Sequence, residues 1–204
     1  MSVMLPDPER YFRKLLPAHS GLLKTMEEEA RREGIPIVGP LVGELLYILA
    51  RATGAARILE LGTATGYSAI FLAQACSETH GRLTALEWEA SLARRAAENI
   101  EQAGLSKWVE VRCVNAFEEM EYTREVFDFV FMDIEKEGYL PMLSHCTRIV
   151  KPGGLLLVDN VGFAEADPFN RAIYESPSWR SASLYAFLPE HSPEKDGLCM
   201  AVRI

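Results

Sequence analysis

The chain has 204 residues, of which 49% are hydrophobic and 25% are charged, a composition typical of one globular domain with a sizeable core. Its net charge of −8 argues against a general nucleic-acid-binding surface, which would need a basic stripe. The apolar stretches are too short or too interrupted to span a bilayer, and the first nine residues carry Pro6, Asp7 and Pro8 where a secretory signal would be basic and then apolar.

The first third of the chain is predicted to be helical. Residues 8–16 form a short helix, and a second helix, capped at His19 or Ser20, runs to Gly34. The rigid connector at residues 35–40 leads into a third helix, in which apolar residues recur at helical spacing.

From residue 57 onward, strand and helix patterns alternate. Strand candidates begin near Arg57, Arg82, Val109, Phe127 and Gly154, and helical patterns lie between them at residues 67–76, 90–103 and 139–150. This alternation predicts βαβ units, and therefore an α/β, Rossmann-like fold whose mostly parallel sheet is covered by helices on both faces.

The end of the chain departs from this rhythm. Residues 167–174 have a helical pattern, and residues 181–188 and 198–204 have strand patterns joined by a polar loop. Two late strands with no helix between them predict an antiparallel hairpin, which completes a seven-stranded sheet. No linker divides the chain, so a single domain is expected over residues 1–204, with an N-terminal helical cover at 1–54 and the Rossmann-like core at 55–204.

Oxygen-bearing side chains follow two of the predicted strands. Asp133 ends the strand that begins at Phe127, and Asp159 with Asn160 ends the next one. If these strands are parallel neighbours, the three side chains meet at the edge where open α/β sheets bind ligands. Hard oxygen ligands suit Mg²⁺, Ca²⁺ or Mn²⁺ better than zinc. Lys136 places an amine beside the same position. Taken singly, each of these residues also fits a helix cap, a turn or a solvated surface.

A glycine-bearing turn follows the first strand. Gly62 and Gly66 lie in the run from Glu60 to Ser68, and Glu87 ends the next strand, where a carboxylate can accept both hydroxyls of a ribose. The spacing is GxxxG, unlike the dinucleotide fingerprint GxGxxG. An acid at Glu60 repels phosphate and favours a cationic ligand, which indicates S-adenosylmethionine (AdoMet), whose carboxylate Ser68 can hold at the start of a helix. The alternative is a βα turn whose glycines serve only geometry.

These motifs resemble the cation-dependent AdoMet O-methyltransferases, the family of the catechol and caffeoyl-coenzyme A enzymes and their small bacterial relatives. The resemblance rests on the ELGxxxGYS run, on Asp133 with Lys136, on Tyr139, and on the turn at residues 150–154 before Asp159 and Asn160. It extends from about Val38 to Asn160, and we expect it to cover the whole chain.

The resemblance implies a role for each matching position. Val38, Glu60, Gly62, Thr63 and Ser68 would hold the methionine side of the cofactor, Glu87 its ribose, and Trp88, Asn115 and Ala116 its adenine. Asp133, Asp159 and Asn160 would bind the divalent cation, most often Mg²⁺, with Asp133 also beside the cofactor and in the catalytic set. Lys136 would be the catalytic lysine.

The chain departs from the family at Glu135, where relatives often have a second Asp, and at Asn115, where they often have Asp. Glu190 in the polar loop at 189–197 matches a substrate-contacting glutamate only weakly, and a solvated acid fits it equally well. Relatives are often homodimers, and a homodimer is expected here largely on that ground.

The resemblance favours methyl transfer from AdoMet to a catechol-like or polyhydroxylated phenol that a divalent cation ionises and orients. One alternative keeps cofactor and cation but methylates a hydroxylated uridine in transfer RNA. Another is a non-catalytic AdoMet-binding protein, which would have no use for Asp133, Lys136, Asp159 and Asn160 together.

Two residue types receive no role in this hypothesis. The cysteines Cys76, Cys113, Cys146 and Cys199 are scattered among apolar neighbours, which favours buried reduced thiols and the cytoplasm as the compartment. The histidines His19, His80, His145 and His191 lie in unrelated segments, and none pairs with an acid or cysteine at metal or triad spacing.

Overall fold

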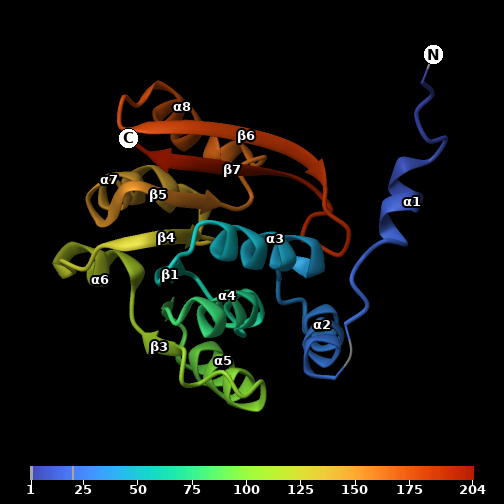
Figure 1. The fold of residues 1–204 in the computed structure, drawn as a ribbon, viewed down its shortest axis with the longest axis horizontal. Helices are drawn as coiled ribbons and strands as arrows, with labels where there is room; N and C mark the ends of the chain where they lie inside the picture. The colour runs from blue at the N-terminus through green and yellow to red at the C-terminus, as the bar shows by residue number, and fades with distance from the viewer. Residues whose placement is uncertain (1, 20) are drawn as a thin grey trace.

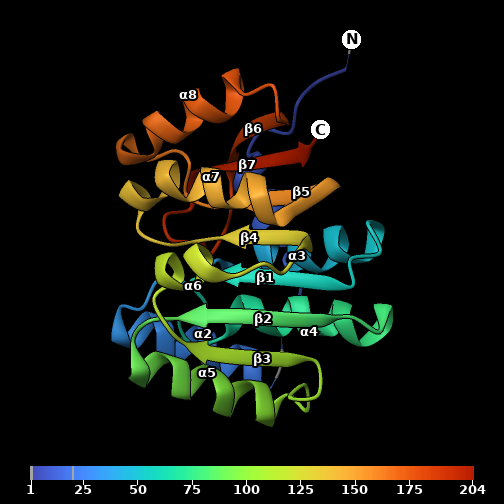
Figure 2. The same ribbon diagram turned by 90° about the vertical axis from the view of Figure 1, so that its left-hand side faces the viewer.

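A seven-stranded sheet lies between two layers of helices in the computed structural model, which describes residues 2–19 and 21–204 (Figures 1 and 2). The strands are β1 (Arg57–Leu61), β2 (Arg82–Glu87), β3 (Val109–Cys113), β4 (Phe127–Met132), β5 (Val150–Val158), β6 (Trp179–Phe187) and β7 (Lys195–Arg203). The helices are α1 (Pro8–Arg13), α2 (Leu22–Glu33), α3 (Gly39–Ala52), α4 (Tyr67–Thr79), α5 (Ala90–Gln102), α6 (Ala116–Tyr122), α7 (Tyr139–Ile149) and α8 (Asp167–Glu175).

The strand order is β3-β2-β1-β4-β5-β7-β6, with β1 to β5 parallel and β7 antiparallel to both of its neighbours. This confirms the predicted α/β sheet and its C-terminal hairpin. The direction of winding reverses between β1 and β4, and open sheets bind ligands beyond the carboxyl ends of the strands at such a point.

Each face of the sheet has its own apolar core. Residues of α3, α4 and the end of α5 pack on one face around Ile58, Phe129 and Leu157. Residues of α6, α7 and α8 pack on the other face around Leu59, Val130 and Leu156. The near-continuous apolar runs of β4 and β5 are explained by this arrangement, because successive side chains enter opposite cores.

Helix α1 stands apart from the sheet and buries none of its residues (Figure 1). Two ion pairs connect it to the β6–β7 hairpin, one between Arg13 and Glu194 at 2.6 Å and one between Lys195 and Glu9 at 2.8 Å. Among the helices of the described residues, none combines the length and the apolar character that crossing a membrane requires.

Several details differ from the sequence prediction, among them the start of β7 at Lys195 instead of residue 198, which places Asp196 in the strand. Helix α1 ends at Arg13, before residue 16. Strand β5 begins at Val150, because Lys151 to Gly154 form a bulge within the strand between its pairings with Phe127 and Phe129. Helix α6 was not predicted. Of the two proposed caps of α2, Ser20 lies outside the described residues, and Gly21 directly precedes the helix.

Three of the four cysteines are buried, as predicted, but Cys113 is exposed. Its position explains the error, because it ends β3, an edge strand that has a neighbour on one side only.

Candidate active site

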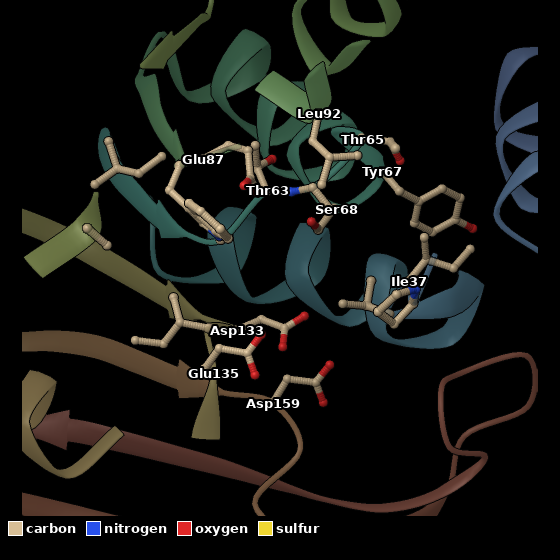
Figure 3. Close-up of a pocket in the computed structure, with 18 of the residues that line it drawn as sticks. Ile37, Thr63, Thr65, Tyr67, Ser68, Glu87, Leu92, Asp133, Glu135 and Asp159 are labelled. Carbon is tan, nitrogen blue, oxygen red and sulfur yellow. Dashed lines mark hydrogen bonds between the residues drawn. The ribbon is translucent and has the colours of Figure 1, made fainter. Parts of the chain in front are cut away.

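A cavity of about 490 Å³ opens beyond the carboxyl ends of the parallel strands (Figure 3). Every predicted site residue except Glu60 lines it: Val38, Gly62, Thr63, Ser68, Glu87, Trp88, Asn115, Ala116, Asp133, Lys136, Asp159 and Asn160. The structure therefore brings these residues together, although the role of each stays a prediction. In Figure 3, Glu87, Thr63 and Ser68 lie on one side of the cavity, and Asp133, Glu135 and Asp159 lie on the other.

The turn after β1 connects these two sides. Gly62 has a φ of +87°, and a Cβ placed on it would lie 2.2 Å from the backbone oxygen of Asp133. Only glycine allows the two strand ends to approach this closely. The backbone N–H of Asp133 donates to the carbonyl of Leu61 at 2.9 Å, which fixes the start of the Asp133 segment against the glycine turn.

Glu60 lies beneath this turn and does not line the cavity. It is fully buried, its Oε2 accepts a hydrogen bond of 2.6 Å from Thr63 Oγ1, and its Oε1 has no partner among the described residues. Burial raises the pKa of Glu60 to about 7, the charges of Asp133 and Glu87 add to the effect, and hydrogen bonds from Ser68 and Thr63 oppose it. Glu60 therefore supports the turn that lines the cavity, and a direct contact of Glu60 with the cofactor stays a prediction.

Glu87 is held by the backbone on both of its oxygens. Its Oε2 accepts from the N–H of Ala64 and its Oε1 from the N–H of Glu89, each at 2.9 Å. The carboxylate is 6% exposed and is therefore fixed in orientation, with lone pairs left for further donors.

The residues Trp88 and Asn115, predicted to contact the adenine, are more exposed than Glu87. Asn115 caps α6, with its Oδ1 accepting from the N–H groups of Phe117 and Glu118. Its side-chain oxygen is therefore already engaged, and the amide Nδ2 is the part left for a ligand. Trp88 is 74% exposed at the rim.

Sheet register explains why Asp133 and Asp159 meet. Met132 pairs with Val158, so the residue after each strand lies at the same level, and the N–H of Asp159 donates to the carbonyl of Met132 at 3.1 Å. Burial raises the pKa of Asp133 to about 6, and the charge of Asp159 contributes in the same direction, whereas Lys136 opposes both. Two carboxylates therefore face each other here.

Lys136 lies beside this pair. Its Nζ is 3.4 Å from Asp133 Oδ1 and 3.4 Å from the carbonyl of Ile134, and 22% of the side chain is exposed. The rings of Tyr139 and Phe163 lie 5.9 Å from Nζ, which leaves the ammonium with a mixed polar and aromatic environment.

The expectation that none of the histidines pairs with an acid was wrong, because His19 pairs with Glu27 and His191 pairs with Asp159. The Nε2 of His191 lies 2.8 and 3.0 Å from the two oxygens of Asp159, its Nδ1 lies 2.6 Å from the carbonyl of Pro193, and both side chains are 1% exposed. Burial lowers the pKa of His191, but the hydrogen bond and the charge of Asp159 outweigh it, and the net direction is upward. No local spacing could have found this pair, because 32 residues separate its members.

Asn160 is held by the same hairpin as Asp159, through Asp196 at the start of β7 and Ser192 in the loop that joins β6 to β7. Its Nδ2 donates to Asp196 Oδ2 at 2.6 Å and lies 3.3 Å from the carbonyl of Ser192. Glu190 lies elsewhere: it lines a neighbouring cavity of about 440 Å³ between α2 and the loop, not the main cavity. The part of the chain that the structure describes contains no group of three His, Cys, Asp or Glu side chains arranged to hold a metal. A cation at this site would therefore depend on the amide oxygen of Asn160 in addition to the two aspartates.

Known proteins share this fold and sequence pattern. A family model described as O-methyltransferase matches residues 18–167. The catechol O-methyltransferase of Niastella koreensis is 34% identical over 159 residues, which cover 75% of this chain and 72% of that protein.

Two solved structures are similar over nearly the whole chain. An O-methyltransferase from Bacillus cereus in complex with SAH has a TM-score of 0.85 at 28% identity and covers 96% of each chain. The O-methyltransferase TomG from Streptomyces achromogenes, involved in tomaymycin synthesis and solved with SAM, has a TM-score of 0.83 at 28% identity, covering 96% of this chain and 95% of that one.

Proposed function

Because the chain belongs to the O-methyltransferase family, we propose that it moves the methyl group of AdoMet to a hydroxyl of a catechol-like or polyhydroxylated phenol, with a divalent cation at Asp133, Asp159 and Asn160. The coarse activity is that of an AdoMet-dependent O-methyltransferase of the catechol and caffeoyl-coenzyme A type. Two relatives support the cofactor, since they were solved with SAH or SAM. The relative from Niastella koreensis supports the phenolic acceptor, since it is named a catechol O-methyltransferase.

The residues present fit AdoMet. Glu87 offers a carboxylate whose orientation is fixed by two backbone N–H groups, which suits a pair of ribose hydroxyls. Ser68 lies in the first turn of α4, where the helix dipole favours the methionine carboxylate. Three acids near the turn, Glu60, Glu87 and Asp133, favour a ligand with positive charge on the sulfonium and amino group.

The donor set also fits a hard dication. Asp133 and Asp159 face each other closely enough for the charge of one to raise the pKa of the other's carboxyl, an arrangement that a cation between them would stabilise. Asn160 adds an amide oxygen from the next position on the chain. Oxygen donors of this kind favour Mg²⁺, with Ca²⁺ or Mn²⁺ as alternatives.

When bound, AdoMet supplies the methyl group on its sulfonium, and a divalent cation supplies the positive charge that favours an ionised acceptor hydroxyl. The chain's own residues do the rest. Glu87 and Ser68 fix the two ends of the cofactor, so that its position relative to the acceptor side of the cavity is set before reaction. Lys136 lies on that acceptor side, where a neutral Nζ would accept the hydroxyl proton and an ammonium would instead stabilise the resulting anion.

The observation that carries this proposal is the convergence of Asp133, Asp159 and Lys136 in the same cavity as Glu87 and Ser68. The test is transfer of labelled methyl from AdoMet to catechol and to caffeic acid, with Mg²⁺ and with a chelator. We expect turnover that the chelator abolishes and added Mg²⁺ restores. Asp133→Asn should remove it, whereas the matched control Asp167→Asn, on the exposed face of α8, should not.

Full activity in chelator, or in Asp133→Asn, would exclude the cation from the proposal. Turnover on transfer RNA alone would exclude the phenolic acceptor, and cofactor binding without turnover on either substrate would exclude catalysis.

Three further expectations belong to this proposal. The whole chain forms one methyltransferase domain. It assembles as a homodimer, for which the exposed apolar residues Tyr11, Phe12 and Leu15 near α1 offer a surface. The cytoplasm stays the predicted compartment, based on cysteines that are free in the structure.

A further inference from the structure

The β6–β7 hairpin places two buried polar side chains at the end of β5. His191, in the loop of the hairpin, is 5% exposed and contacts Asp159, and Asp196, at the start of β7, is 1% exposed and contacts Asn160. Asp159 and Asn160 are consecutive residues of the candidate cation site, and each is held by a different residue of this hairpin. Buried polar groups of this kind are costly unless they are paired, and all four are paired here.

Asp196 decides which atom Asn160 offers to the cavity. An amide side chain has an oxygen that accepts and a nitrogen that only donates. The Nδ2 of Asn160 donates to Asp196 Oδ2 at 2.6 Å and also faces the carbonyl oxygen of Ser192. The amide is thereby locked with Oδ1 as its remaining polar atom, and an oxygen is the atom a hard dication requires.

Asp196 is itself fixed. Its other oxygen, Oδ1, accepts from the backbone N–H groups of Gly162 at 3.0 Å and Gly197 at 2.6 Å. The carboxylate therefore cannot rotate to release Asn160 without breaking buried hydrogen bonds.

His191 acts in the same way on Asp159. Its Nδ1 faces the carbonyl of Pro193 and its Nε2 faces both oxygens of Asp159, so each ring nitrogen already has a partner. Neither ring nitrogen is therefore free to take a proton from the substrate that accepts the methyl group. The ring instead fixes the plane of the Asp159 carboxylate, which also accepts from the N–H of Asn160 at 2.8 Å.

We propose that Asp196 and His191 are positioning residues of the cation site, which set the orientation of the Asn160 amide and of the Asp159 carboxylate so that oxygen atoms are presented to the ion. This inference rests on the cation part of the proposed function. It assigns to the β6–β7 hairpin a contribution to cation affinity, in addition to any contact with the acceptor.

The test measures Mn²⁺ binding by the electron paramagnetic resonance of the free ion, without acceptor and independently of turnover. In Asp196→Asn, an NH₂ group can replace the accepting Oδ2, so the Asn160 amide turns and presents nitrogen to the ion. We expect the Kd for Mn²⁺ to rise about 10- to 100-fold, the usual effect of losing a partner that orients a metal ligand. Asp167→Asn is the matched control and should leave the Kd unchanged.

An exchange of the two residues provides the rescue. The double variant Asn160→Asp with Asp196→Asn restores one donor facing one acceptor at unchanged net charge, and it should bind Mn²⁺ at least as well as the wild type. Asn160→Asp alone places two carboxylates against each other and should not reach the affinity of the double variant. For His191, Gln keeps an N–H donor and Phe keeps only the volume, so His191→Gln should retain more affinity than His191→Phe.

The outcomes separate the two proposals. If the wild type binds no Mn²⁺, the cation site itself is wrong and this inference falls with it. If the wild type binds Mn²⁺ and Asp196→Asn binds it equally well, or if the exchange rescues nothing, only the positioning role is overturned. Binding of S-adenosylhomocysteine serves as the measure of an intact fold and should be the same in all variants.

Discussion

Glu60 provides a sensitive test of the electrostatics of this fold, because it is a fully buried carboxyl beneath the glycine turn, and one of its oxygens has no hydrogen-bond partner within residues 2–19 and 21–204. The perturbation is Glu60→Gln, which keeps the shape and removes the charge. Burial, with the charges of Asp133 and Glu87, raises the pKa of Glu60 from 4.5 to about 7 in the folded chain. The unfolded chain returns it to its ordinary value.

The direction in which the unfolding free energy changes with pH follows from the number of protons that the folded and unfolded states bind. Between pH 4.5 and about 7 the folded state holds a proton on Glu60 that the unfolded state has lost. The stability contribution is therefore complete below pH 4.5 and is lost as the pH rises through about 7. At about 1.4 kcal/mol for each pKa unit, the difference amounts to about 3 kcal/mol of unfolding free energy.

The assay is urea unfolding at pH 5 and at pH 8 for the wild type, for Glu60→Gln, and for Glu98→Gln, an exposed control with the same change of charge. The wild type and the control should lose about 3 kcal/mol more stability between the two pH values than Glu60→Gln does. Asp133, whose pKa is raised to about 6, adds a dependence of the same sign that all three proteins share. An equal pH dependence in Glu60→Gln and the wild type would refute the reasoning.

Three other substitutions test separate parts of the structure. Gly62→Ala should lower the unfolding free energy by about 2–4 kcal/mol in urea titrations, because its Cβ would clash with the backbone of Asp133. The control is Gly54→Ala, which is also at positive φ but has no atom within 4 Å of the added Cβ, and it should cost only about 1 kcal/mol. Lys136→Met should lower kcat about 10²- to 10⁴-fold in the methyl-transfer assay while the Kd of S-adenosylhomocysteine stays unchanged; a normal kcat would remove Lys136 from the catalytic role. Asp128→Asn should cost about 2–3 kcal/mol at pH 7 without changing KM, because Asp128 accepts from the N–H groups of Ala56 and Arg57 and pairs with Lys151. Although burial raises its pKa, these partners hold it below 3.8 overall, so the contribution of Asp128 should disappear as the pH falls through that range.

The strands and the residues that follow them could be predicted from the sequence, because strand burial and strand ends are local properties. The apolar runs of β4 and β5 identify them as buried strands, and parallel pairing then places Asp133 and Asp159 at one level. The bulge at Lys151 to Gly154 could not be predicted in this way, since Pro152 and two glycines normally indicate a turn. Only the pairing with β4 on both sides of the bulge keeps these residues in the strand.

The contacts that the β6–β7 hairpin makes with the end of β5 depend on how the hairpin packs beside that strand. Asp196 contacts Asn160 across 36 residues of sequence and His191 contacts Asp159 across 32, separations at which no motif spacing applies. Glu60 shows what a motif position leaves open. Its place in the motif was clear from the sequence, but only the packed structure shows that it is buried beneath the turn and that Thr63 donates to its Oε2.

The arrangement of acids at this sheet edge also constrains how the proposed reaction proceeds. The charge of Asp133 acts on Glu60 and that of Asp159 acts on Asp133, so acidic side chains extend from the glycine turn to the end of β5. An ionised phenol entering this cavity alone would meet carboxylates on the acceptor side, with the ammonium of Lys136 3.4 Å from Asp133. Under the proposed function, further positive charge is therefore needed before the acceptor ionises, and this is the part that the proposal assigns to the cation.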